Sequence, residues 1–224
     1  DDNLTPNYAS DDRTINVYAS DAVPGALVRM YDGATLGAAF LLDNVPTAPD
    51  FVQRLEGLTL AASGGTIGQS SFTSDAMVVW ASSFELTTAR TLDVQAVGGV
   101  DRRLLVDGAA VSGPQTLAVG VHTVEARFAV TDLAQMPLSI DILEGGVVAS
   151  DITALLNHDE SAVQPVVHSM PSVGTDLGGN RIDISGFGFF PASQVVVHWG
   201  SQDLTVADFD EFGSELIVFD SPPG

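Results

Sequence analysis

Residues 178–190 read GGNRIDISGFGFF, with four glycines, two isoleucines two positions apart and three phenylalanines. Glycines at this density either surround a phosphate group or form turns in a β-sheet. A dinucleotide-binding loop needs a strand before its glycines and a helix after them. Here the alternating Ile182 and Ile184 follow the first glycine pair, and Pro191 follows the last phenylalanine. The glycines are therefore interpreted as turn and bulge residues around a β-strand, and not as a nucleotide site.

The rest of the chain repeats this succession of short β-type runs and turn clusters. Asp107-Gly108 lies between two apolar arms and predicts a type I′ hairpin over residues 103–111. A second hairpin is predicted around Gly120, and one short helical turn at 151–156. The pattern predicts an all-β fold made of two consecutive β-sandwiches. The predicted strands are 14–19, 26–31, 76–84, 91–97, 116–119, 121–130, 138–143, 182–184, 194–199 and 215–219.

Alternation also predicts which side chains face the core. In residues 121–130 the core face is predicted to carry His122, Val124, Ala126, Phe128 and Val130. In residues 91–97 it is predicted to carry Leu92, Val94 and Ala96. Trp80 and Trp199 both lie in apolar strands, so both are expected to pack in a core.

The charge of the chain is strongly negative. Asp and Glu total 29, Lys and Arg total 8, and the net charge is −21. All eight basic residues are arginines, so the chain has no lysine. Such a surface repels nucleic acid and anionic lipid, and neither is expected as a partner. The acidity suits salt-rich or calcium-rich surroundings, in which cations reduce self-repulsion; it equally suits the solubility of an exported protein.

Several classes of chemistry are excluded by residue types. The chain has no cysteine, which excludes disulfides, thiolate zinc sites and a cysteine nucleophile. No stretch approaches the ~18 uncharged apolar residues of a membrane helix, so no membrane insertion is expected. We expect any signal peptide to have been removed or to lie outside the chain. No metalloprotease or nucleophile-elbow motif occurs, and no nucleophile is paired with a base, so we expect no enzymatic activity.

Acidic clusters supply the candidate metal ligands, and calcium is the cofactor that they suit. Asp is a short, hard oxygen ligand, and the candidates are Asp11, Asp12, Asp101, Asp208, Asp210 and Glu211. For each cluster the alternative is a solvated acidic loop without a metal. Aromatic rings that could form a platform for sugars are Tyr18, Tyr31, Phe209 and Phe212.

The C-terminal quarter of the chain carries a specific set of features. These are Pro171 with Gly174, Gly178-Gly179, Gly186-Phe187-Gly188-Phe189, Trp199-Gly200 and Ser221-Pro222-Pro223. The set resembles an IPT/TIG domain, which is an immunoglobulin-like β-sandwich. The resemblance implies such a domain at residues 164–224, incomplete at the C-terminus, because TIG domains usually continue past the Ser-Pro-Pro turn. Either the polypeptide continues after Gly224, or a neighbouring chain supplies the missing strand.

A second resemblance covers about residues 14–144. The matching segments are 15–18, 27–33, Val79-Trp80, 103–108 and 120–128. They resemble a PA14 domain, a β-sandwich attached to glycosidases, toxins and adhesins. Some PA14-like modules bind sugars through calcium held by adjacent aspartates. Family members often carry Asp-Asp-Gly before the strand equivalent to 103–108, whereas residues 98–101 here read GGVD and leave only Asp101.

Together these observations predict an organisation and a role. We expect an acidic tail or linker at 1–13, a PA14-like sandwich at 14–150, a linker at 151–163 and the IPT/TIG domain at 164–224. The predicted function is a non-catalytic structural or adhesive module of a larger extracellular or cell-surface protein or filament. Its expected partners are other extracellular subunits, neighbouring domains of the same polypeptide, or glycans. The alternative is calcium-dependent carbohydrate binding by the PA14-like domain, as an accessory region of a secreted glycosidase.

Overall fold

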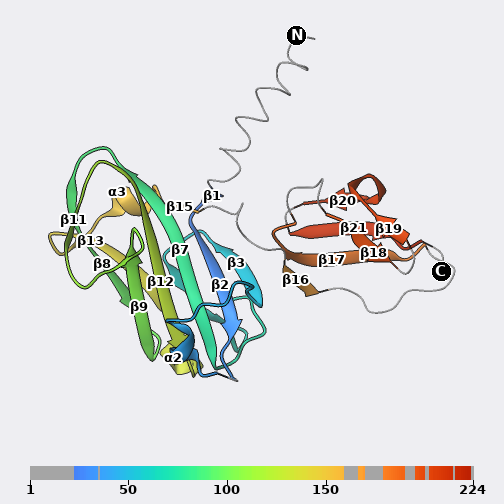
Figure 1. Cartoon of the computed structure of the whole chain (residues 1–224), viewed down its shortest axis with the longest axis horizontal. Helices are drawn as coiled ribbons and strands as arrows, with labels where there is room; N and C mark the ends of the chain where they lie inside the picture. The colour runs from blue at the N-terminus through green and yellow to red at the C-terminus, as the bar shows by residue number, and fades with distance from the viewer. Residues whose placement is uncertain are drawn as a thin grey trace, which may run out of the picture. The chain divides into compact units, whose positions relative to one another are not determined.

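The computed structural model describes residues 23–34, 36–158, 166–169, 179–189, 195–199, 202–213 and 215–222. The chain divides into two compact units, residues 1–160 and 161–224. Both units consist of antiparallel β-strands with a few short helical turns (Figure 1). The predicted all-β fold class is therefore confirmed. The predicted tail at 1–13 and strand at 14–19 lie outside the described residues.

The larger sheet of the first unit is built around two long strands. β7 (Ala76–Leu86) and β12 (Gly120–Val130) pair along their full eleven residues, with Trp80 opposite Ala126. β2 (Ala26–Asp32) and β3 (Phe51–Leu55) extend the sheet beyond β7, and β9 (Asp101–Val106) and β10 (Ala109–Ala110) extend it beyond β12. β1 (Val23–Pro24) and β15 (Asn157–His158) pair with each other, and β15 also pairs with β7.

The smaller sheet has the order β11-β8-β13-β14. Its strands are β11 (Gln115–Leu117), β8 (Arg90–Val97), β13 (Leu138–Glu144) and β14 (Val147–Val148), and β4 (Thr59–Leu60) also pairs with β13. The remaining elements are the hairpin of β5 (Ala62–Ser63) and β6 (Thr66–Ile67), the turn η1 (Leu133–Gln135), and the short helices α2 (Ala38–Leu41) and α3 (Ser150–Thr153).

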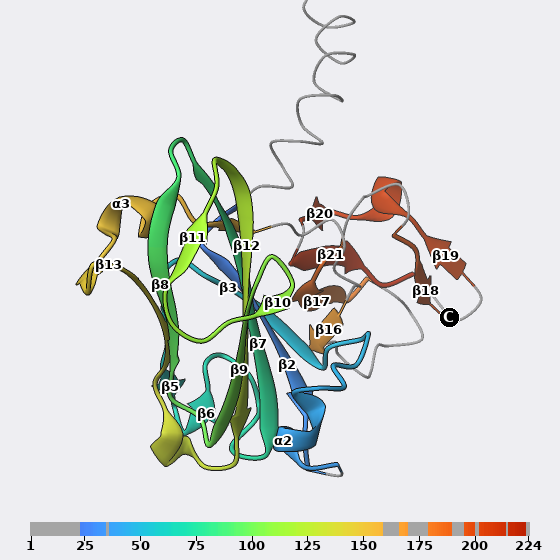
Figure 2. The same cartoon turned by 60° about the vertical axis from the view of Figure 1, so that its left-hand side comes forward.

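One hydrophobic core lies between these two sheets, which form the two layers of a sandwich (Figure 2). The larger sheet contributes Trp80 and Phe128, and the smaller sheet contributes Leu92, Ile140 and Ile142. Burying each such side chain contributes roughly 1.5–3 kcal/mol, so alternating apolar residues on facing strands hold the layers together. The predicted core faces of 91–97 and 121–130 are confirmed, because their apolar even-numbered residues belong to this core or pack against it, and His122 is buried.

The first predicted hairpin is confirmed and the second is wrong. Asp107 and Gly108 have φ angles of 51° and 75°, and Val106 pairs with Ala109 across them, as a type I′ turn requires. Around Gly120, by contrast, β11 does not pair with β12. β11 pairs with β8 in the smaller sheet, so the chain crosses between the two layers at this point.

The predicted linker at 151–163 is also corrected. Residues 150–158 form α3 and β15 and belong to the first unit. His158 pairs with Val23, and Asn157 pairs with Ser83 of β7. The physical reason is that Ile152 of α3 and Leu156 after it are buried in the core between the sheets.

The second unit has a four-stranded sheet and a separate hairpin. The sheet order is β16 (Val166–Ser169), β17 (Arg181–Phe187), β21 (Leu216–Asp220) and β20 (Glu211–Phe212). The hairpin joins β18 (Val197–Trp199) to β19 (Gln202–Leu204), and the turn η3 (Val206–Asp208) follows it. Ile182, Ile184 and Phe219 of the sheet pack with Leu204 and Trp199 of the hairpin. Trp199 is only partly buried.

The glycines of residues 178–190 have the structural role that the sequence predicts. β17 follows Gly179, whose φ is 74°, and Gly188 after the strand has a φ of 75°. Gly186 permits a close approach of neighbouring atoms. A Cβ atom there would lie 2.2 Å from the carbonyl oxygen of Val166 and 2.4 Å from the ring of Phe189. Within the described part of the chain, no helix has the length and hydrophobicity that a membrane span requires.

Candidate functional site

Two adjoining hollows lie along β8 in the first unit. The first, here called the edge cavity, has a volume of about 400 Å³ and is lined by β8 at 93–96, by Arg102 and Leu104 of β9, and by Val111 and Gly113. The second, here called the turn cavity, has a volume of about 550 Å³ and lies between Arg90, Pro114 and the turn at Gly145-Gly146. Asp93 lines both cavities, and the two together are here called the groove along β8.

Asp93 has spare hydrogen-bonding capacity in this groove. Its Oδ2 accepts a hydrogen bond from Gln95 Nε2 at 2.6 Å. Its Oδ1 is buried and has no donor among the described residues. A buried acceptor without a donor costs about 1–3 kcal/mol, so such atoms usually mark a place where a ligand or water completes the site.

Arg102 is the second polar side chain of the edge cavity. Its main-chain N–H donates to Asp101 Oδ1 at 2.8 Å, while its side chain is exposed. Its guanidinium group forms no ion pair with any described residue. The edge cavity therefore offers both an acceptor at Asp93 and a multiple donor at Arg102.

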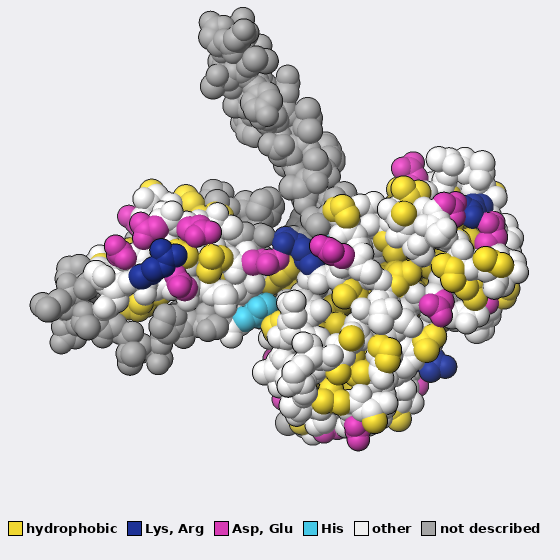
Figure 3. All heavy atoms as spheres, turned by 180° about the vertical axis from the view of Figure 1, so that it is seen from behind, with side chains coloured by type: hydrophobic (Ala, Val, Ile, Leu, Met, Phe, Trp, Pro, Cys, Tyr) yellow, Lys and Arg dark blue, Asp and Glu magenta, His cyan; other side chains and the backbone are white. Residues whose placement is uncertain are grey.

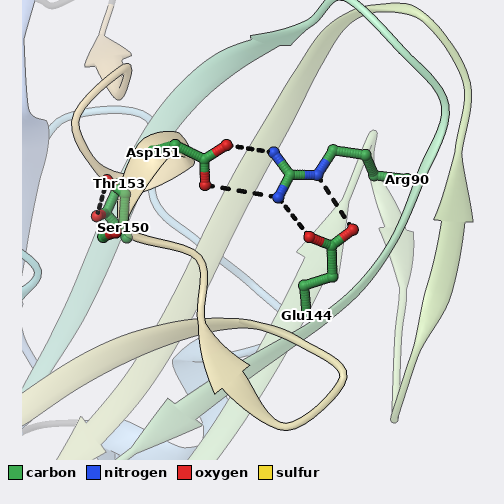
Figure 4. Close-up of polar contacts among 5 residues, drawn as sticks. All are labelled: Arg90, Glu144, Ser150, Asp151 and Thr153. Carbon is green, nitrogen blue, oxygen red and sulfur yellow. Dashed lines mark hydrogen bonds and ion pairs between the residues drawn. The ribbon is translucent and has the colours of Figure 1, made fainter.

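The turn cavity is bordered by an ion-pair network (Figure 4). Arg90 at the start of β8 donates from Nε to Glu144 Oε1 at 3.1 Å and from Nη1 to Asp151 Oδ2 at 2.5 Å. These hydrogen bonds raise the pKa of Arg90 and lower the pKa values of Glu144 and Asp151. One guanidinium thereby joins β8, the end of β13 and α3, and leaves a net negative charge beside the cavity.

A buried histidine forms a second polar cluster away from the groove. His122 is only 8% exposed, and its Nδ1 lies 2.8 Å from Asp107 Oδ2 while its Nε2 lies 2.9 Å from the Ala118 carbonyl oxygen. Both neighbours are acceptors, so only the doubly protonated ring can donate to both. The hydrogen bond that the ring donates to Asp107 raises the pKa of His122. Burial raises the pKa of Asp107, but its hydrogen bonds with His122 and the Thr123 N–H outweigh this and lower it.

The predicted calcium ligands that the structure describes are divided between the two units. Asp101 is exposed at the start of β9 in the first unit, and the other described candidates lie in the second unit. Asp208 accepts a hydrogen bond from the Thr205 N–H and caps η3, while Asp210 and Glu211 are exposed. Asp11 and Asp12 lie outside the described residues. No group of three or more His, Asp or Glu residues in the described ranges could hold a metal ion.

The aromatic rings predicted as sugar platforms differ in exposure. Tyr31 is 1% exposed, packed beneath α2 on the outer side of the larger sheet, so it is not an exposed platform. Phe209 and Phe212 are partly buried and stack on each other with ring centroids 6.0 Å apart. Tyr18 lies outside the described residues.

Arg90, Asp93 and Arg102 carry no signal in the sequence that marks them as functional. The alternation in residues 91–97 placed Asp93 and Gln95 on the face away from the core, which any solvated strand shows. The groove depends on where β11 ends and how β9 lies against β8, and both are set by contacts between distant segments.

Comparison with known proteins gives no family. No family model matches the chain, and no curated protein sequence matches it. Among solved structures, it is similar to the GH31 alpha-xylosidase from Xanthomonas citri, with 14% sequence identity and a TM-score of 0.38. The similarity covers 62% of this chain but only 16% of that enzyme. The resemblances to PA14 and IPT/TIG domains stay predictions.

Proposed function

We propose that the chain is a non-catalytic contact module of a larger extracellular or cell-surface protein, with a structural or adhesive role. The observation that carries the proposal is the groove along β8. Its polar groups are a carboxylate, an amide and guanidinium groups, which are suited to hydrogen bonding with a bound partner. Asp93 and Arg102 keep hydrogen-bonding capacity that the described residues do not use.

The arrangement of the chain supports a role in contact. Two compact β-units follow each other in one polypeptide, and sheet edges are places where another chain can add. The surface also selects partners by charge. Asp and Glu side chains recur over the visible faces of both units in Figure 3, in keeping with the net charge of −21. Such a surface repels anionic partners and attracts cationic ones over several ångströms.

The test is whether the protein is monomeric or part of an assembly in extracts of the cells that produce it. Native extracts are fractionated by sedimentation, and the chain is followed with an antibody raised against it. We expect it to sediment as part of a polymer or large complex whose other subunits can be cross-linked to the first unit. Cross-linking should use carboxylate-reactive chemistry, because the chain has no lysine. A strictly monomeric particle without cross-linked partners would contradict the proposal.

A further inference from the structure

We infer that the edge of β8 at Val94 and Ala96 is a docking site for an extended segment of a partner polypeptide, which adds to the smaller sheet in line with β11. This inference rests on the proposed contact function and names the class of partner. The segment is expected to carry a basic residue that donates to Asp93.

The first step concerns the opposite side of β13. The Ile140 N–H donates to the Leu58 carbonyl at 3.0 Å, and the Ala149 N–H donates to the Ile142 carbonyl at 2.8 Å. In an antiparallel strand, the N–H and C=O of one residue point to the same side, and successive residues alternate. The main-chain polar groups of Ile140 and Ile142 therefore point away from β8.

The register then fixes the direction of the β8 groups. Ala96 lies opposite Ile140, and Val94 lies opposite Ile142. These two pairs are not hydrogen-bonded to each other, so the N–H and C=O of Val94 and Ala96 also point away from β13. On that side they face the edge cavity, which both residues line. Nothing else in the described chain pairs with them.

β11 shows that this side of β8 accepts a strand. Arg90 and Leu92, which have the same orientation as Val94 and Ala96, lie opposite Leu117 and Gln115 of β11. β11 ends at Gln115, because Pro114 has no N–H to donate and Gly113 has a φ of 88°, which turns the chain away from β8. The edge cavity occupies the place where a continuation of β11 would run.

The free edge has neither a proline nor a bulge to oppose pairing. Natural edge strands are commonly blocked by proline, lysine or a bulge. Residues 93–97 read DVQAV and contain neither proline nor lysine, and their register with β13 is continuous. Val97 at the end of this segment is 44% exposed. An unprotected edge beside a hollow is the arrangement that β-strand addition uses.

Charge indicates the side chain of the partner. Asp93 Oδ1 lacks a donor among the described residues, and the adjoining turn cavity is lined by Glu144 and by Arg90, which also pairs with Asp151, so one positive charge faces two negative ones. A lysine or arginine next to the paired backbone would supply the donor and the positive charge. At the other wall, the Arg102 guanidinium can donate to a carbonyl or carboxylate of the same segment.

The test uses the 224-residue chain labelled with ¹⁵N and a capped peptide, Thr-Val-Lys-Val-Thr, followed by amide chemical shifts. We expect titration to shift the amide signals of Val94 and Ala96 and to leave those of the second unit unchanged. The same peptide with N-methyl groups on alternate residues cannot pair with the strand edge. Loss of one or two hydrogen bonds should weaken its binding about tenfold.

Two variants sharpen the result. Ala96→Pro removes an N–H that faces the cavity without touching the β13 ladder, and proline is tolerated at such edge positions, so the fold should persist while peptide binding is lost. The parent chain should bind the lysine peptide more tightly than the same peptide with glutamate in place of lysine. Asp93→Asn should reduce this difference in affinity. If the N-methylated peptide shifts the same signals equally, main-chain pairing is overturned.

Other outcomes separate this inference from the proposed function. If no peptide binds while the native protein still sediments as a complex, the contact function stands and the β8 site is wrong. If neutral oligosaccharides shift Val94 and Ala96 and peptides do not, the groove is a glycan site and the inference fails. If the native protein is monomeric yet the peptide binds at β8, the site stands without the assembly role.

Discussion

His122 is a buried ring held between two acceptors, and that position makes its charge a part of the fold. The pKa of His122 is raised above its ordinary value of 6.5 in the folded chain. Its contribution to stability is therefore fully present below pH 6.5 and is lost as the pH rises through the folded pKa. The pKa of Asp107 is lowered from 3.8, so its contribution is present above that value and is lost as the pH falls through the folded pKa.

This linkage gives a prediction for His122→Gln. At about pH 6 the variant should melt about 2–4 °C below the parent protein, which corresponds to a hydrogen bond of about 1 kcal/mol. The difference should shrink as the pH rises through the folded pKa of His122, because the ring then loses its proton. Thermal unfolding followed by circular dichroism across this range measures it. Asp107→Asn should also abolish this pH dependence of the melting temperature. If the difference between His122→Gln and the parent protein does not change with pH, the ring is not charged in the folded chain.

Gly186 gives a second prediction at this scale. A methyl group there would contact the Val166 carbonyl and the Phe189 ring at distances that no real Cβ adopts, so Gly186→Ala should cost about 1–3 kcal/mol through overpacking. Hydrogen-exchange protection of the β17 amides is the measurement. Gly213→Ala is the matched control, because its nearest atom would lie 3.9 Å away. Equal protection in both variants would show that the close approach does not matter.

Arg90 acts at the scale of elements, because one side chain connects β8, β13 and α3. Arg90→Ala should lower the melting temperature of the first unit, and by more at low salt than at high salt, since exposed ion pairs are screened. The control is Arg181→Ala. Its partner, Asp183, lies two residues away on the same strand, and both side chains are more than half exposed, so no measurable effect is expected. If Arg90→Ala lowers the melting temperature equally at low and high salt, the effect comes from lost packing and not from lost charge.

Elements whose pairing is local were predictable, and those set by distant contacts were not. The Asp107-Gly108 hairpin was predictable because two residues with positive φ angles determine it. The predicted hairpin at Gly120 failed because β11 finds its partner in β8, more than twenty residues earlier in the chain. The groove along β8 was missed for the same reason. The edge of β8 is free where Gly113 and Pro114 end β11. The alternation within residues 91–97 does not indicate where a distant strand ends.

At the scale of the whole molecule, repulsion between carboxylates is the main electrostatic effect. Eight arginines can neutralise at most eight of the 29 negative charges, so most of the negative charge is not compensated. Raising sodium chloride from about 0.05 M to about 1 M shortens the screening length from over 10 Å to about 3 Å, and the melting temperature should rise. An unchanged or falling melting temperature would contradict this expectation.

Calcium separates screening from specific binding. At matched ionic strength, calcium chloride and sodium chloride should raise the melting temperature by similar amounts if the acidity acts only through screening. A larger rise with calcium, reversed by EDTA, would establish a bound ion, and the variants Asp208→Asn and Asp101→Asn would then locate it. The same chelation applied to glycan-array binding tests the alternative of calcium-dependent carbohydrate recognition.

The pairing of β1 with β15 has a mechanical consequence. Val23 and His158 are direct partners in register, one at the start of the first unit and the other near its end. A pulling force along the polypeptide would enter the unit through these two residues and peel their short ladder open one rung at a time. The eleven-residue ladder of β7 and β12 does not carry this load at first. The short outer strands would therefore separate before it, and the chain would lengthen while the core stays folded.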